Sequence, residues 1–75
     1  MAESRGNIVI VEDDAGLNQA LTRLLQAAGF HTTGFASAAA ALQSEATRDA
    51  HCLVLDVHLS DMSGYEVQRR LAETG

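Results

Sequence analysis

Lysine and proline are absent from this 75-residue chain, and cysteine occurs only once. Because lysine is missing, arginine supplies all five fixed cations, and the net charge is −5. That charge balance disfavours direct nucleic-acid binding, which requires a basic face. The single cysteine, Cys52, lies in an apolar run, so we expect a small buried side chain in a protein of a reducing compartment.

Long apolar runs are missing too. No stretch approaches the ~20 apolar residues of a membrane span, and no charged-then-apolar leader opens the chain, so we expect a cytoplasmic protein without a membrane partner. A hydrophobic content of 47% favours a packed core over disorder. The length allows one small domain, which buries about 60% of its unfolded surface. We expect residues 1–6 to be flexible and residues 7–75 to form this domain.

Two segments with strand character flank the first expected helix. The β-branched run at residues 7–11 predicts a strand, and residues 30–35 predict a weaker one that Gly34 places at a sheet edge. Asp13 or Asp14 is expected to cap the helix between them, and Gly29 to follow its end. Apolar residues at helical spacing form one stripe on this helix. They are Leu17, Ala20, Leu21, Leu24, Leu25 and Ala28.

An alanine-rich segment follows the second strand. Ser37 is expected to cap a helix over residues 38–46, in which Leu42 is the single large apolar residue. Alanine favours this helix by propensity, but burial anchors it poorly. Residues 47–50 then form the loop into the next strand.

The apolar run at residues 51–55 predicts a third strand that is buried on both faces. Ser63 and Glu66 form a capping-box pair at the start of a third helix, which ends at Ala72. The order is therefore β-α-β-α-β-α with three helices. Strands that alternate with helices predict an α/β fold with a parallel sheet and right-handed crossovers.

Acidic residues stand at the exits of the first and third strands. Glu12 and Asp13 directly follow the first strand, and Asp56 follows the third. Because parallel strands end on the same edge, these acids converge if the two strands are neighbours, in the crevice where the strand order reverses. Three close carboxylates repel one another, so some of them must either take up a proton or bind a cation. Mg²⁺ in particular is usually held by one or two carboxylates together with waters and phosphate oxygens. Asp56 is then a candidate nucleophile that forms an aspartyl phosphate.

Simpler interpretations exist for each of these residues. The run from Glu12 to Asp14 can serve only as the acidic start of a helix, for which Asp14 is the better cap. Asp56 can be a turn residue that ends a strand, and Asp61 is expected to be one. The three histidines lack a second histidine or cysteine at ligand spacing and are expected at the surface.

Three segments together resemble a known family. They read IVIVEDD, FASAAAAL and LVLDVHLSDMSGYEVQRRL, and the resemblance covers residues 7–75. The chain is similar to the receiver domain of bacterial two-component response regulators, most of all to receivers that precede LuxR-type DNA-binding domains. The resemblance implies the flavodoxin-like fold of CheY, a signalling role rather than an enzyme, and a sensor histidine kinase as partner.

The resemblance also implies roles for individual residues. The acidic pair of the family falls on Glu12 and Asp13, and its phosphoacceptor falls on Asp56. The backbone carbonyl that helps to hold Mg²⁺ falls on His58. Where the family often has proline, this chain has Ser60, which frees one φ angle of the loop.

The chain holds three of the five βα units of a receiver, in the partial strand order 2-1-3. A hydroxyl residue that ends the fourth strand and a lysine that ends the fifth contact the phosphoryl group in the family, and this chain has neither. We therefore expect phosphorylation to be impaired. We also expect a homodimer, because the third strand, residues 51–57, is left as an apolar edge without lysine or proline. The dimer forms either by pairing these edges or by exchanging elements.

Two other functions stay open. The chain can act purely as an interaction or dimerisation module without phosphoryl chemistry. A phosphate hydrolase of the haloacid-dehalogenase kind also starts from an aspartate that leaves an apolar strand. Those enzymes place a second aspartate two residues later, where this chain has His58, so this class is the least favoured.

Overall fold

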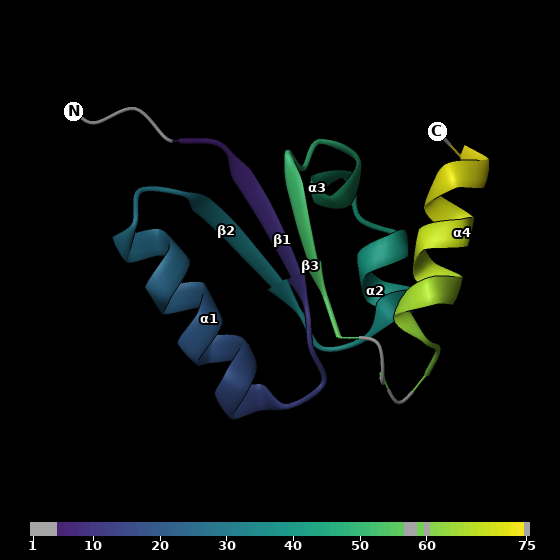
Figure 1. Cartoon of the computed structure of the whole chain (residues 1–75), viewed down its shortest axis with the longest axis horizontal. Helices are drawn as coiled ribbons and strands as arrows, with labels where there is room; N and C mark the ends of the chain where they lie inside the picture. The colour runs from purple at the N-terminus through teal and green to yellow at the C-terminus, as the bar shows by residue number, and fades with distance from the viewer. Residues whose placement is uncertain (1–4, 57–58, 60, 75) are drawn as a thin grey trace.

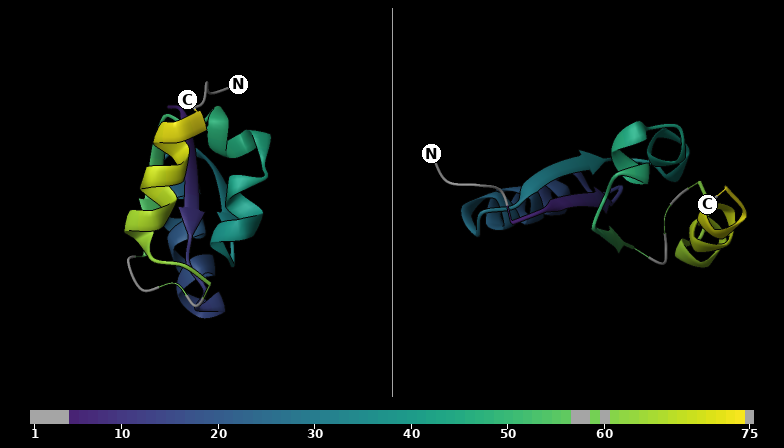
Figure 2. Two further views of the ribbon diagram at one scale, coloured as in Figure 1. Left: turned by 90° about the vertical axis from the view of Figure 1, so that its right-hand side faces the viewer. Right: turned by 90° about the horizontal axis from the view of Figure 1, so that it is seen from above.

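A three-stranded sheet with helices on both sides makes up the computed structural model, which describes residues 5–56, 59 and 61–74 (Figure 1). Helix α1 lies on one side of the sheet, and α2, α3 and α4 lie on the other (Figures 1 and 2). The strands are β1 (Asn7–Val11), β2 (His31–Phe35) and β3 (Cys52–Leu55). The helices are α1 (Ala15–Ala27), α2 (Ala38–Leu42), α3 (Glu45–Arg48) and α4 (Gly64–Thr74).

The strand order is β2-β1-β3, and both pairs are parallel. Val9 lies opposite Thr33 on one side and Leu53 on the other. This confirms the predicted parallel sheet and its order, with β2 at an edge. Strand β1 is central, so its carboxyl end has a neighbouring strand end on each side.

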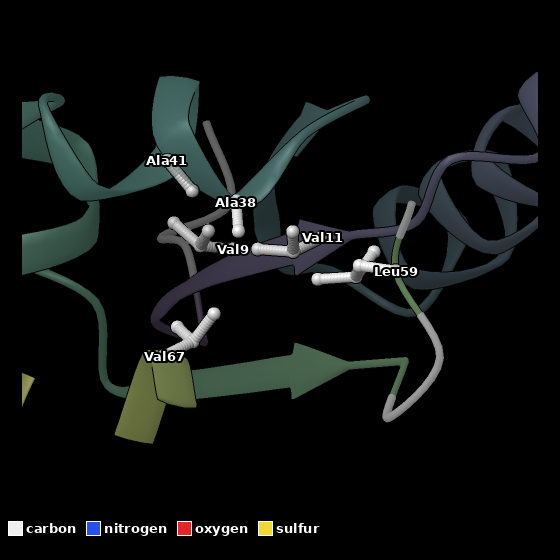
Figure 3. Packing of buried hydrophobic residues seen from close by; sticks show 6 residues of the cluster. All are labelled: Val9, Val11, Ala38, Ala41, Leu59 and Val67. Atoms are coloured by element: carbon white, nitrogen blue, oxygen red, sulfur yellow. The ribbon is translucent and has the colours of Figure 1, made fainter. Parts of the chain in front are cut away.

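The main core lies between the sheet and helices α2 and α4. Val9 and Val11 point from β1 towards side chains of both helices and of the loop after β3 (Figure 3). Ile8 and Ile10 are buried as well and point to the opposite face, because successive strand residues alternate. The buried cluster of Figure 3 consists of Val9, Val11, Ala38, Ala41, Leu59 and Val67.

The number of helices differs from the prediction. The alanine-rich segment forms two short helices instead of one, because the chain leaves α2 at Gln43 and Ser44 starts a new helix. The Ser44 hydroxyl accepts a hydrogen bond from the N–H of Ala46 at 3.1 Å, as an N-cap does. The described residues therefore form four helices. The loop predicted over residues 47–50 is wrong at its start, since Thr47 is helical and buried.

Helix α1 has the predicted ends. Asp14 caps it by accepting from the N–H of Leu17 at 3.1 Å, and Gly29 follows it with a φ of 99°. The apolar stripe is covered only in part. Leu21 and Leu25 are half-buried, whereas Leu17 and Leu24, seven residues apart, are 47% and 66% exposed.

Strand β3 begins one residue later than predicted, at Cys52, and Val57 lies outside the described residues. Cys52 is exposed, so the prediction of a buried thiol is wrong. The reason is the place of β3 at the edge of the sheet: among the described residues, β1 flanks it on one side and no strand flanks it on the other.

Helix α4 has the predicted Ser63 cap, but the predicted capping box is only half formed, and the helix ends at Thr74 instead of Ala72. The Ser63 hydroxyl accepts from the N–H of Glu66 at 3.2 Å. The Glu66 carboxylate binds Arg69 at 2.8 Å and Arg70 at 3.3 Å instead of completing a capping box. These arginines hold the pKa of Glu66 below its usual value. No helix within the described ranges is long and apolar enough to cross a membrane.

Strand β2 and helix α1 approach closely at Gly34. A Cβ atom at this position would clash with Oδ1 of Asn18 and lie 3.2 Å from Oγ1 of Thr22. Asn18 has little freedom to move away, because its amide nitrogen donates to the carbonyls of Glu12 and Phe35 at 2.9 Å each. Glycine is therefore needed at position 34 of β2, because a larger residue would displace the Asn18 side chain.

We predict that Gly34→Ala lowers the free energy of unfolding by about 1–3 kcal/mol, because displacing Asn18 breaks two hydrogen bonds. Gly16→Ala is the matched control. A Cβ there meets only Asp14 at an ordinary 3.4 Å, so this helical substitution should stabilise by about 0.4–1 kcal/mol. Urea unfolding followed by circular dichroism measures both. Equal effects of the two substitutions would contradict the role of Gly34.

Candidate metal centre

Three carboxylates meet at the carboxyl edge of the sheet. Glu12 and Asp13 follow β1 directly, and Asp56 follows β3. Each offers a carboxylate oxygen, and these oxygens all lie within 4.8 Å of one another. The name acidic cluster is used below for these three residues.

Backbone hydrogen bonds hold the two halves of the acidic cluster beside each other. The N–H of Glu12 donates to the carbonyl of Phe35 at 3.0 Å, at the end of β2. The N–H of Asp56 donates to the carbonyl of Val11 at 3.1 Å, at the end of β1. The hydrogen-bond ladder of the sheet thus runs one residue past the strands and includes the first acid on each side.

The three acids differ in burial. Glu12 is only 7% exposed, Asp56 is half-buried and Asp13 is exposed. Oε2 of Glu12 accepts from the N–H of Asp14 at 3.0 Å, which orients that carboxylate. The acidic cluster is therefore buried at Glu12 and accessible from solvent at Asp13.

The donor set fits a hard divalent cation. Three carboxylate oxygens this close repel one another, and a cation removes the repulsion. Mg²⁺ is commonly held by one or two carboxylates and completes its octahedron with water or phosphate oxygens. Glu12, Asp13 and Asp56 supply such oxygens, and the open side leaves room for the remaining ligands. His58, predicted to add its backbone carbonyl, lies outside the described residues.

Asn18 supports the acidic cluster and was not foreseen from the sequence. Its amide nitrogen donates to the carbonyls of Glu12 and Phe35, so it links α1 to the carboxyl ends of β1 and β2 beside the acidic cluster. Phe35 is 17 residues away in the chain. Because asparagine inside a helix carries no local mark of such a contact, sequence reasoning had no signal for it.

Asp61 is more than the turn residue predicted. Its Oδ1 accepts from the N–H of Ala38 at 3.1 Å, and its Oδ2 accepts from the N–H of Ala39 at 2.9 Å. The backbone hydrogen bonds from Ala39 and Ala38 lower the pKa of Asp61. A lowered pKa stabilises the fold above the unfolded value of about 3.9. This contribution disappears as pH falls through the lower folded value.

The histidines do not join the acidic cluster. His31 and His51 are exposed at the opposite end of the sheet, as predicted for surface residues. Nδ1 of His51 accepts from the N–H of Asn7 at 3.0 Å, which ties the starts of β3 and β1 together. The described histidines therefore have no part in the candidate metal centre.

Comparison with solved structures supports the fold. The chain aligns with the crystal structure of full-length FixJ from B. japonicum with a TM-score of 0.80 and 33% sequence identity. The alignment covers 95% of this chain and 35% of the FixJ chain. The flavodoxin-like receiver fold with the partial strand order 2-1-3 is thereby confirmed.

Curated relatives agree with the structure. The response regulator protein TmoT from Ectopseudomonas mendocina is 40% identical over 75 residues, which are 100% of this chain and 34% of TmoT. Nodulation protein W from Bradyrhizobium diazoefficiens is 38% identical over 71 residues, which are 95% of this chain and 31% of that protein. The chain thus spans about a third of the length of these relatives.

The family model described as the response regulator receiver domain matches residues 8–75. This range includes β3, β1 from Ile8 onward, the acidic cluster and the four helices of the described residues. The chain belongs to the response regulator receiver domain family.

Proposed function

We propose that the chain is a Mg²⁺-dependent phosphoacceptor of two-component signalling, with Asp56 as the residue that takes up the phosphoryl group. The observation that carries this proposal is the acidic cluster, whose oxygens lie within 4.8 Å at the ends of β1 and β3. Membership of the receiver family supports it. Asp13 and Asp56 are the proposed direct ligands, together with the carbonyl of His58, and Glu12 acts through water.

Phosphoryl transfer to the chain requires a nucleophile and a site that positions the phosphoryl group and neutralises its charge. A carboxylate oxygen of Asp56 attacks phosphorus, the bond between phosphorus and the donor atom breaks, and Asp56 becomes an acyl phosphate. Mg²⁺ held by Asp13 and Asp56 would neutralise the charge that the phosphoryl oxygens bring next to the carboxylates. Asp56 stands at the end of a hydrogen-bonded strand, so it meets the donor with little freedom of position.

The proposed donor is the phosphohistidine of a cytoplasmic sensor histidine kinase. A macromolecular donor fits the open side of the cluster at Asp13, which is exposed. The chain spans about a third of the length of its curated relatives TmoT and nodulation protein W. Two further relatives, FixJ from Bradyrhizobium diazoefficiens and TdiR from Thauera aromatica, are named transcriptional regulatory proteins.

A second function, an interaction module that uses the edge of β3, is favoured by a specific observation. The strand Cys52–Leu55 contains no charge or proline, and Cys52 is exposed. A cavity of about 450 Å³ lies beside it, lined in part by Cys52, Leu53 and Leu71. Such an edge is a template for another strand. We propose that a second copy pairs with it when the 75-residue chain is alone.

Mg²⁺ titration of the ¹⁵N-labelled chain should move the amide signals of residues 12–14 and 56, because the ligands are the acids there. Asp13→Asn should weaken Mg²⁺ binding by at least about tenfold. Loss of a group that only supports a ligand typically costs about 10–100-fold, and loss of a direct ligand should cost no less. Asp49→Asn removes an exposed acid at the end of α3 and is the control. Signals that stay in place, or equal weakening by both substitutions, would refute the metal centre.

Phosphorylation of the 75-residue chain by acetyl phosphate and Mg²⁺ should be slow and incomplete. Cationic and hydroxyl donors aimed at the developing phosphoryl charge supply several kcal/mol in such reactions, and the chain has no lysine. Intact mass spectrometry measures the uptake, with Asp56→Asn as the control for modification elsewhere. Rapid, stoichiometric labelling that Asp56→Asn abolishes would show that the acidic cluster suffices by itself.

The 75-residue chain should sediment as a dimer at micromolar concentration if copies pair through β3. Cys52→Lys places a charge on the edge and should shift the species towards monomer. Cys52→Ser keeps the size of the side chain and should leave the dimer intact. A well-folded monomer of the unsubstituted chain contradicts the pairing, as does a dimer that Cys52→Lys leaves unchanged.

A further inference from the structure

Asp61, in the loop after β3, binds the backbone of α2. Both carboxylate oxygens of Asp61 accept backbone hydrogen bonds, from Ala38 at 3.1 Å and from Ala39 at 2.9 Å. The next N–H of α2, that of Ala40, is bound by the Ser37 hydroxyl at 3.2 Å. Ser37 and Asp61 thus share the first turn of α2, but only Asp61 comes from another part of the chain.

Asp61 is one of three attachments of the same loop. At its start, the N–H of Asp56 binds the carbonyl of Val11. In its middle, Leu59 is 8% exposed and packs in the core beside Val11 and Ala38 (Figure 3). At its end, Asp61 binds α2. Contacts with β1, with the core and with α2 therefore hold Asp56, Leu59 and Asp61, respectively.

The acidic cluster needs this restraint. Asp56 follows a four-residue strand that is paired on one side only among the described residues. Its carboxylate lies within 4.8 Å of those of Glu12 and Asp13, and the like charges push it away. The hydrogen bonds of Asp61 oppose that movement without touching the cluster itself.

We propose that Asp61 is a positioning residue for the acidic cluster, which holds the Asp56 loop on α2 and keeps the carboxylates together for Mg²⁺. The inference rests on the proposed Mg²⁺ site. In this inference, Asp61 does not bind Mg²⁺ itself but raises the Mg²⁺ affinity of the acidic cluster. A partner that holds a ligand in place commonly contributes a 10–100-fold effect on metal affinity.

Mg²⁺ affinity of three variants tests the proposal. Asp61→Ala removes both hydrogen bonds to α2 and should raise the Kd for Mg²⁺ about tenfold or more. Asp61→Asn keeps one acceptor oxygen and should lie between Asp61→Ala and the unsubstituted chain. Ser37→Ala removes a cap of the same helix without releasing the loop, so its Kd should stay unchanged. Amide signals of Glu12 and Asp13 report the binding.

Each alternative gives a different pattern. If Asp61→Ala and Asp61→Asn weaken Mg²⁺ binding equally, the lost charge is the cause and the proposal fails. If Ser37→Ala weakens binding as much as Asp61→Ala, Asp61 only stabilises α2 and the proposal also fails. An unchanged Kd in Asp61→Ala overturns it directly.

A second readout separates this inference from the proposed function. Amide hydrogen exchange of Asp56 and Leu59 should become faster in Asp61→Ala and stay the same in Ser37→Ala, with or without Mg²⁺. If the unsubstituted chain does not bind Mg²⁺ but exchange follows this pattern, the metal site fails while the attachment of the loop stands. Unchanged exchange in Asp61→Ala refutes the attachment, whatever Mg²⁺ does.

Discussion

Parallel pairing of β1 with β3 determines the position of the acidic cluster, because it brings two strand ends that are more than forty residues apart to one edge. The chain leaves β1 through α1 to β2 on one side and then crosses back to β3 on the other. A reversal of this kind opens a crevice at the carboxyl ends. The backbone hydrogen bonds of the sheet continue to Glu12 and Asp56, so the spacing of the paired strands sets the distance between these two residues.

Hydrogen bonds of two residues outside the acidic cluster, Asn18 and Asp61, oppose the charge repulsion within it. On the β1 side, the amide of Asn18 binds the Glu12 and Phe35 carbonyls, and the lack of a side chain at Gly34 makes this contact possible. On the β3 side, Asp61 binds the backbone of α2. Both contacts bind main-chain atoms and leave the carboxylate oxygens available. A site can thus be rigid and still keep its ligands free for a cation.

The sequence allowed correct prediction of what depends on local signals or on strand alternation. The parallel sheet followed from the β-α alternation, whereas its strand order was implied by the resemblance to receiver domains. The caps Asp14 and Ser37 followed from residue type and spacing. The division between α2 and α3 was missed, because Ser44 competes as a cap with the alanine propensity around it. Prediction failed most where distant segments meet. The exposure of Cys52 depends on which strand lies beside β3, and no local pattern encodes that.

The same limit explains the supporting residues of the site. The acids of the cluster carry a readable signal, since Glu12 and Asp56 directly follow apolar strands and Asp13 is the next residue after Glu12. Asn18 and Asp61 bind residues 17 to 23 positions away, and in sequence they look like an ordinary helix residue and an ordinary turn residue. The residues that hold a site in place are therefore harder to predict than those that form it.

Occupation of the β3 edge and the chemistry of Asp56 are linked by strand direction. A parallel neighbour ends beside Asp56, because parallel strands share their carboxyl edge, and so brings new side chains to the acidic cluster. An antiparallel neighbour, as in a two-fold pair of β3 strands, brings the start of its strand to that place instead. The partner's residues near Cys52 would then stand beside Asp56. The two ways of covering this edge therefore give Asp56 different surroundings, and a chain that pairs with its own copy leaves no room for a parallel strand that could complete the site.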